Sequence, residues 1–142
     1  MVFEEDKSQT GNRNPAKNRK KVLIIDDKKE NLDVVSFFLE ANEVDYKVLD
    51  DGRIALDTIR NEGSIYQLIL LDLAMPGFSG VDVFNSLKSD RLIEKIPLVL
   101  FTASSVSEEQ INGLLNSGAK GIVYKPVSVE DLERMVDKYL RD

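Results

Sequence analysis

The chain contains no cysteine and no histidine among its 142 residues. Without cysteine it can form no disulfide, no thiolate metal site and no cysteine nucleophile. Without histidine it can hold no Ser-His-Asp triad, no imidazole metal site and no phosphohistidine of its own. Any metal site in this sequence must therefore rest on oxygen ligands.

Long hydrophobic runs are also missing. No apolar run approaches the roughly 20 residues that span a membrane, and no signal peptide is visible. Hydrophobic residues make up 42% of the chain and charged residues 31%, a balance typical of a globular domain. The length fits one domain of ordinary size. We therefore expect a cytoplasmic, single-domain protein without membrane insertion.

The charge is unevenly distributed along the chain. The net charge is −6, yet residues 1–21 hold six basic and three acidic side chains. Because residues 1–20 show no apolar period, we predict a disordered basic arm there, solvated or in contact with nucleic acid or an acidic partner. The remaining residues 21–142 form an acidic body, which argues against direct nucleic-acid binding because phosphate contacts need lysine and arginine.

From Lys21 onward, short apolar runs alternate with amphipathic stretches. The predicted strands are Val22–Ile25, Tyr46–Leu49, Leu68–Leu71, Leu98–Phe101 and Ile122–Tyr124. The second run is interrupted by Lys47, so we expect it at an edge of the sheet. This alternation predicts an α/β fold, a doubly wound (βα)5 parallel sheet with helices on both faces.

The last amphipathic stretch shows how the helices are predicted. Val129, Leu132, Val136 and Tyr139 follow helical spacing and would form one apolar stripe. Ser128 precedes them and is followed by acidic residues in the first turn, a pattern typical of a helix N-terminus.

Chemically reactive side chains follow four of the predicted strands. These residues are Asp26 and Asp27 after the first run, Asp72 after the third, Thr102 after the fourth and Lys125 after the fifth. Parallel strands deliver their carboxyl ends to the same edge of a sheet, where ligands bind in open α/β folds. We therefore expect three carboxylates, a hydroxyl and an ammonium to converge in one site.

Such a cluster of carboxylates needs compensation, because like charges raise one another's pKa. Lys125 offsets one charge, and a hard divalent cation, Mg²⁺ or alternatively Mn²⁺, would offset the rest through oxygen ligands. Asp26 and Asp27 suit chelation. Asp72 stands alone at the middle strand, so we predict that it is the nucleophile that forms an aspartyl phosphate. Thr102 and Lys125 would then face the phosphoryl group.

Four motifs match a known family: IIDD at 24–27, LLDLAMPGFSG at 70–80, FTA at 101–103 and YKP at 124–126. In these motifs and their spacing, residues 21–142 resemble the receiver domain of two-component response regulators. The resemblance implies a flavodoxin-like sheet with strand order 2-1-3-4-5. It also implies transfer of a phosphoryl group from a histidine kinase to the central aspartate.

The resemblance implies a role for each metal-binding position. Asp27 would bind Mg²⁺ directly, and Asp26 would act mainly through water. Asp72 would be both the phosphoacceptor and a metal ligand. The backbone carbonyl of Ala74 would complete the protein's share of the ligands.

The resemblance also implies how the phosphoryl group is held. Thr102 would bind a phosphoryl oxygen and move on activation, together with the backbone amide of Ala103. Lys125 would pair with the phosphoryl group, and the Lys125–Pro126 peptide bond is typically cis in the family.

Among the departures from the family pattern, two concern the switch and the rim of the site. The usual switch aromatic, three residues before the lysine, is here Ile122, whereas Tyr124 is aromatic one residue before Lys125. Ile122 and Tyr124 are thus the two candidate switch residues beside Thr102. Lys28 directly follows the acidic pair, and we expect it to be a solvated lysine at a helix start, with a positive charge at the rim of the site as the alternative.

We therefore expect a stand-alone receiver of the chemotaxis type, which catalyses only its own phosphorylation and dephosphorylation and is otherwise no enzyme. Its partners would be a sensor histidine kinase or histidine phosphotransfer protein and an unidentified downstream protein, and it would be a monomer or a phosphorylation-dependent dimer. One alternative is a receiver fragment of a larger hybrid kinase or regulator. Another is a Mg²⁺-dependent phosphatase of the haloacid dehalogenase type, although that family places Asp-x-Asp after the first strand. A flavodoxin is less favoured, because acidic residues after the first strand would repel a flavin phosphate.

Overall fold

The computed structural model describes residues 20–103 and 105–141. Five parallel strands form one sheet in the order β2-β1-β3-β4-β5. The strands are β1 (Lys21–Ile25), β2 (Asp45–Leu49), β3 (Leu68–Leu71), β4 (Leu98–Ala103) and β5 (Gly121–Lys125). This order confirms the predicted fold, and the strand that contains Lys47 lies at the sheet edge, as expected.

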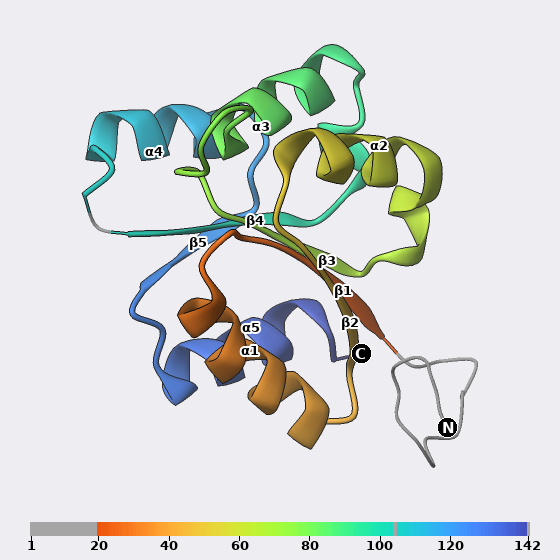
Figure 1. Cartoon of the computed structure of the whole chain (residues 1–142), viewed down its shortest axis with the longest axis vertical. Helices are drawn as coiled ribbons and strands as arrows, with labels where there is room; N and C mark the ends of the chain where they lie inside the picture. Colours follow the sequence, from red (N-terminus) through yellow and green to blue (C-terminus); the bar gives the residue numbers. More distant parts are fainter. Residues whose placement is uncertain (1–19, 104, 142) are drawn as a thin grey trace.

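Five α-helices cover the two faces of the sheet (Figure 1). They are α1 (Lys29–Ala41), α2 (Gly52–Glu62), α3 (Gly80–Ser89), α4 (Glu108–Asn116) and α5 (Val129–Tyr139). Helices α2, α3 and α4 lie on one face, and α1 and α5 lie on the other. Among the described residues, no helix combines the length and the apolar character needed to cross a membrane.

The central strands are buried on both faces, which explains their unbroken apolar sequences. In β1, Leu23 and Ile25 point to the core beneath α2, α3 and α4, while Val22 and Ile24 point to the core beneath α1 and α5. All four side chains are fully buried. The sheet is therefore a rigid platform with its carboxyl-terminal edge left for polar residues.

Strands β4 and β5 extend further than their apolar runs predict. The parallel ladder pairs Thr102 with Tyr124 and Ala103 with Lys125. Thr102 and Lys125 therefore lie among the last paired residues of β4 and β5 rather than after the strands. Backbone hydrogen bonds hold both residues in place, so their positions do not depend on a loop.

The N-terminal turn of α5 and the residue Lys20 can be compared with the sequence predictions. Ser128 and Asp131 form a reciprocal capping box at α5, as predicted. Val129 is 57% exposed and does not belong to the buried stripe of α5, which Met135 joins instead. Of the predicted arm, residues 1–19 lie outside the described residues, and the Lys20 carbonyl already accepts a hydrogen bond from the Asp45 amide.

Candidate functional site

The three aspartates lie together at the carboxyl-terminal edge of the sheet. The Asp72 amide donates to the Ile25 carbonyl at 2.9 Å, and the Asp26 amide donates to the Leu49 carbonyl at 3.0 Å. These bonds continue the strand pairing by one residue and fix both backbones. Carboxylate oxygens of Asp26, Asp27 and Asp72 lie within 4.8 Å of one another.

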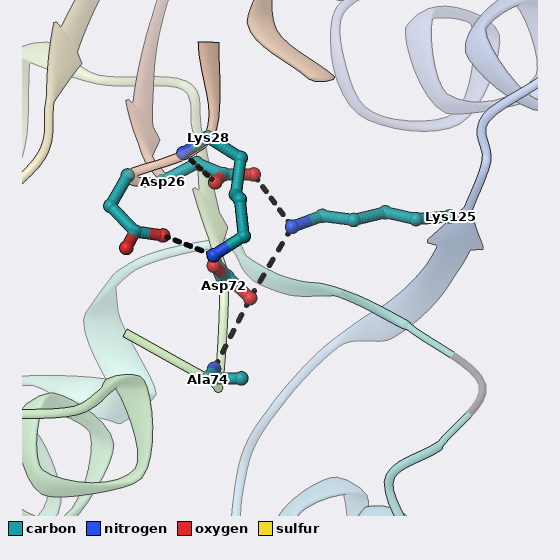
Figure 2. A network of polar contacts seen from close by, with 6 residues as sticks. Asp26, Lys28, Asp72, Ala74 and Lys125 are labelled. Carbon is teal, nitrogen blue, oxygen red and sulfur yellow. Dashed lines mark hydrogen bonds and ion pairs between the residues drawn. The ribbon is translucent and has the colours of Figure 1, made fainter. Parts of the chain in front are cut away.

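Lys125 reaches this cluster from β5 (Figure 2). Its Nζ lies 2.7 Å from Asp26 Oδ2 and 3.3 Å from Asp72 Oδ1, and only 11% of its side chain is exposed. The ammonium also lies 4.9 Å from the centre of the Phe101 ring. Phe101 was not among the predicted site residues. It shares a sheet face with Lys125, since Lys125 pairs with Ala103 and Phe101 lies two residues before Ala103 on the same strand.

The surroundings of Asp72 disfavour its ionised form. Burial raises the pKa of this carboxyl, and the neighbouring Asp26 adds to the rise, while the Ala74 amide and Lys125 oppose it. The Ala74 amide donates to Asp72 Oδ1 at 3.2 Å. A buried carboxylate with a raised pKa gains from a further positive charge, whether it comes from a cation or a partner.

The donor set fits a hard divalent cation. Asp27 Oδ1 is buried and has no hydrogen-bond partner, and it lies in the same cluster as the other two carboxylates. Among the described residues, only one ammonium, that of Lys125, pairs with Asp26 and Asp72, and it does not pair with Asp27. Oxygen-only ligation by a few carboxylates suits Mg²⁺ or Mn²⁺.

Lys28 lies at the rim of the site. Its backbone amide donates to Asp26 Oδ1 at 2.8 Å, and its Nζ lies 3.7 Å from Asp27 Oδ1. Figure 2 shows the side chain turned back towards the cluster. Lys28 is thus an exposed lysine at a helix start, as expected, with 56% of its side chain exposed, and it also places a positive charge at the rim of the site, which was the alternative.

The predicted phosphoryl-binding residues lie on β4 next to the cluster. Thr102 is fully buried, and its Oγ1 has no hydrogen-bond partner. Ala103 is exposed at the end of the strand. An orphaned buried hydroxyl is costly, so Thr102 has a hydrogen bond available for a ligand.

The two candidate switch residues differ in their surroundings. Ile122 is partly buried and packs against the core beneath α2, α3 and α4. Tyr124, which pairs with Thr102 in the ladder, is 41% exposed. The following Lys125–Pro126 peptide bond is cis, as the resemblance implied.

A close backbone contact shapes the connection after Asp72. Gly80, the first residue of α3, lies so near the Asp72 backbone that a Cβ there would be 1.9 Å from the Asp72 carbonyl oxygen. Ser79 and Asp82 cap the same helix through a reciprocal capping box. The motif at 70–80 contains this glycine, but its contact depends on how α3 packs and could not be predicted from the residue type.

The sequence model of the family described as "Response regulator receiver domain" matches residues 22–137. Two-component response regulator ORR5 of Oryza sativa subsp. japonica is 29% identical over 120 residues, which cover 84% of this chain and 88% of that protein. DNA-binding response regulator MtrA of Mycobacterium tuberculosis is 32% identical over 123 residues, which cover 87% of this chain but 51% of MtrA.

Solved structures of response regulators superpose on this chain as well. The Francisella response regulator 1452 receiver domain superposes with a TM-score of 0.71 at 29% identity, covering 84% of this chain and 95% of that one. Vibrio cholerae chemotaxis protein CheY4 superposes with a TM-score of 0.73 at 24% identity, covering 86% of this chain and 99% of that one. At that identity, the second likeness concerns the fold alone.

Proposed function

This chain belongs to the response regulator receiver domain family of two-component systems, and from this premise we propose that it accepts one phosphoryl group on Asp72. The observation that carries the proposal is the position of Asp72, whose buried carboxylate lies between Lys125 and the Ala74 amide. Among the three clustered aspartates, it alone follows the central strand β3.

The contacts of Asp72 indicate which oxygen reacts. Oδ1 accepts from the Ala74 amide and pairs with Lys125, so we assign the nucleophile to Oδ2. This oxygen would form a bond to phosphorus while the bond from phosphorus to the donor nitrogen breaks. The electron pair of that bond stays on the departing imidazole nitrogen, which then takes up a proton. The donor would be a phosphohistidine of a sensor histidine kinase or histidine phosphotransfer protein, since this chain has no histidine.

Three further residues would hold the transferred group. Lys125 already pairs with Asp72 and would pair with a phosphoryl oxygen. The orphaned Thr102 hydroxyl would donate a hydrogen bond to another oxygen, and the Ala103 amide would donate a second one. Charge-assisted hydrogen bonds of this kind are about twice as strong as neutral ones.

The acidic cluster would hold the cation. Asp27 and Asp72 would be direct ligands with the Ala74 carbonyl, and Asp26 would act mainly through water. Mg²⁺, or alternatively Mn²⁺, would supply positive charge against the developing charge of the phosphoryl oxygens. The protein's own part is to fix the carboxylates on the rigid ends of β1 and β3.

The output would be a change in protein–protein contacts. A phosphoryl group adds about −1.5 to −2 charge and three strong acceptors, and Thr102 would be drawn towards it from the end of β4. Tyr124, its ladder partner, is exposed enough to report this movement to a downstream protein, whereas Ile122 is partly buried against the core. The chain would act as a monomer or as a phosphorylation-dependent dimer, by itself or as the receiver part of a longer protein.

Intact-mass spectrometry tests the proposal. Wild type and Asp72→Asn are incubated with a small-molecule phosphodonor, with Mg²⁺ or with EDTA. We expect one phosphoryl adduct on wild type that needs Mg²⁺, and none on Asp72→Asn.

The matched control is Asp33→Asn, which makes the same replacement of a carboxylate oxygen by an amide nitrogen at an exposed aspartate of α1. It should retain the adduct. Stoichiometric phosphorylation of Asp72→Asn would overturn the assignment of the acceptor. Continuous release of phosphate from many substrates without an adduct would favour the phosphatase alternative.

A further inference from the structure

Lys28 occupies a position for which helix formation gives no reason. It is the N-cap residue of α1, and its side chain makes no capping hydrogen bond. Serine, threonine, aspartate and asparagine are the residues that cap this position well. A positive charge there is also unfavourable, because the N-terminus of a helix carries the positive end of its dipole.

The acidic cluster supplies the missing reason. The Lys28 amide binds Asp26 Oδ1, which fixes the start of the side chain beside the cluster. Its ammonium then lies 3.7 Å from Asp27 Oδ1, a buried oxygen without a hydrogen-bond partner. At this distance the pair is an ion pair but not a hydrogen bond, so it is loosely held.

Two lysines divide the three carboxylates between them. Lys125 forms ion pairs with Asp26 and Asp72, and Lys28 forms one with Asp27. The two differ in how easily they can leave. The Lys125 side chain is 11% exposed and enclosed by the fold, whereas 56% of the Lys28 side chain is exposed and free to turn into solvent.

We propose that Lys28 is a tethered counterion of Asp27 that a divalent cation has to displace, so that it lowers the affinity of the site for Mg²⁺. The inference rests on the metal site of the proposed function and adds a residue that tunes it. In the metal-free protein the ammonium of Lys28 neutralises the carboxylate that Lys125 does not reach. When the cation binds Asp27, the ammonium turns away, and its repulsion of the cation persists at the rim of the site.

Isothermal titration of metal-free protein with Mg²⁺ alone tests the proposal. Lys28→Met keeps the length of the side chain but removes its charge. Lys29→Met is the matched control, because Lys29 is exposed, makes no ion pair within the described residues and changes the net charge equally. We expect the Kd of Lys28→Met to be about fivefold lower than that of Lys29→Met at low salt. Lys28→Arg should bind Mg²⁺ nearly as wild type does.

Salt provides a second readout that a structural role would not move. Because the competing charge is largely exposed, the ratio between the two Kd values should shrink towards one as NaCl is raised from about 0.01 M to about 1 M. Equal Kd values for Lys28→Met and Lys29→Met at low salt would overturn the role of Lys28 while leaving the metal site intact. A higher Kd for Lys28→Met would overturn it too, by making Lys28 a supporting group. If none of the proteins bound Mg²⁺, the metal site itself would be wrong, even if phosphorylation proceeded without it.

Discussion

Asp72 shows at the residue scale how a functional group can oppose stability. Only 3% of its surface is exposed, and burial raises the pKa of its carboxyl. Its ion pair with Lys125 is shared with Asp26, so one ammonium serves two carboxylates. In the metal-free protein, the ionised Asp72 therefore costs folding free energy that is recovered only when further positive charge arrives.

Asp72→Asn should therefore stabilise the metal-free protein. The side-chain carbonyl oxygen of the introduced asparagine can still accept the hydrogen bond from the Ala74 backbone amide. The ion pair of Lys125 with Asp26 stays in place. We expect the free energy of unfolding to rise by about 1 kcal/mol at neutral pH. Urea unfolding in EDTA measures it.

The pH dependence of this difference has a definite sign. An acid whose pKa is raised on folding binds more protons in the native state than in the unfolded state, between its ordinary value of 3.8 and the raised one. In that window this contribution to stability falls as pH rises, and above it the loss is complete. The advantage of Asp72→Asn should thus grow with pH and then level off. A wild type more stable than the variant at neutral pH would contradict this account.

Thr102 carries the second prediction at this scale. Its buried hydroxyl has no hydrogen-bond partner, so Thr102→Val should leave the free energy of unfolding unchanged or raise it by up to about 1 kcal/mol. The variant should still take up the phosphoryl group on Asp72 but show a weaker structural response. Urea unfolding and amide chemical shifts of α4 before and after phosphorylation measure the two effects. Strong destabilisation would mean that the hydroxyl already has a partner, and Thr102→Ser, which retains the hydroxyl, serves as the control.

At the scale of elements, the packing of α3 against β3 positions the reacting group. Gly80→Ala places a methyl group 1.9 Å from the Asp72 carbonyl oxygen, so the helix or the strand end must shift. We expect a loss of about 1–3 kcal/mol of stability and slower phosphorylation. Gly113→Ala in α4 is the control, because nothing lies within 4 Å of its added methyl group. That substitution should stabilise the protein by about 0.5–1 kcal/mol. Urea unfolding gives the stability of both variants, and intact mass gives their rates of phosphorylation by a small donor. Equal stabilities and equal rates for Gly80→Ala and Gly113→Ala would refute the contact.

The elements also show how far the sequence alone leads. The apolar runs predict the five strands, most clearly β1, β3 and β4, which are buried on both faces and tolerate only apolar side chains. The strand order followed from the resemblance to receiver domains and not from the runs themselves. The polar ends of β4 and β5 escaped prediction, since backbone pairing continues beyond the apolar residues. The charge of Lys28 at the rim of the site was predicted only as an alternative, and the contact of Gly80 escaped prediction. Both depend on how α1 and α3 meet the sheet, which no local pattern encodes.

At the scale of the whole molecule, the cation and the fold should be linked. A ligand that binds only the native state stabilises it by about 2.7 kcal/mol at a concentration 100-fold above its Kd. Mg²⁺ should therefore raise the Tm of wild type relative to EDTA at equal ionic strength. Asp27→Asn removes a carboxylate of the cluster and should abolish most of that rise. Scanning calorimetry measures the Tm of both proteins. An equal Mg²⁺-dependent rise in wild type and Asp27→Asn would mean that the cation binds elsewhere.

Chemical trapping of the phosphoryl group tests the central claim most directly. Wild type is phosphorylated by a small donor in Mg²⁺, reduced with borohydride, which converts an aspartyl phosphate to homoserine, and digested for tandem mass spectrometry. The account predicts homoserine at position 72 and unmodified aspartate at positions 26 and 27. Homoserine at position 26 or 27, or a phosphoryl adduct that survives reduction as a hydroxyl ester, would contradict it.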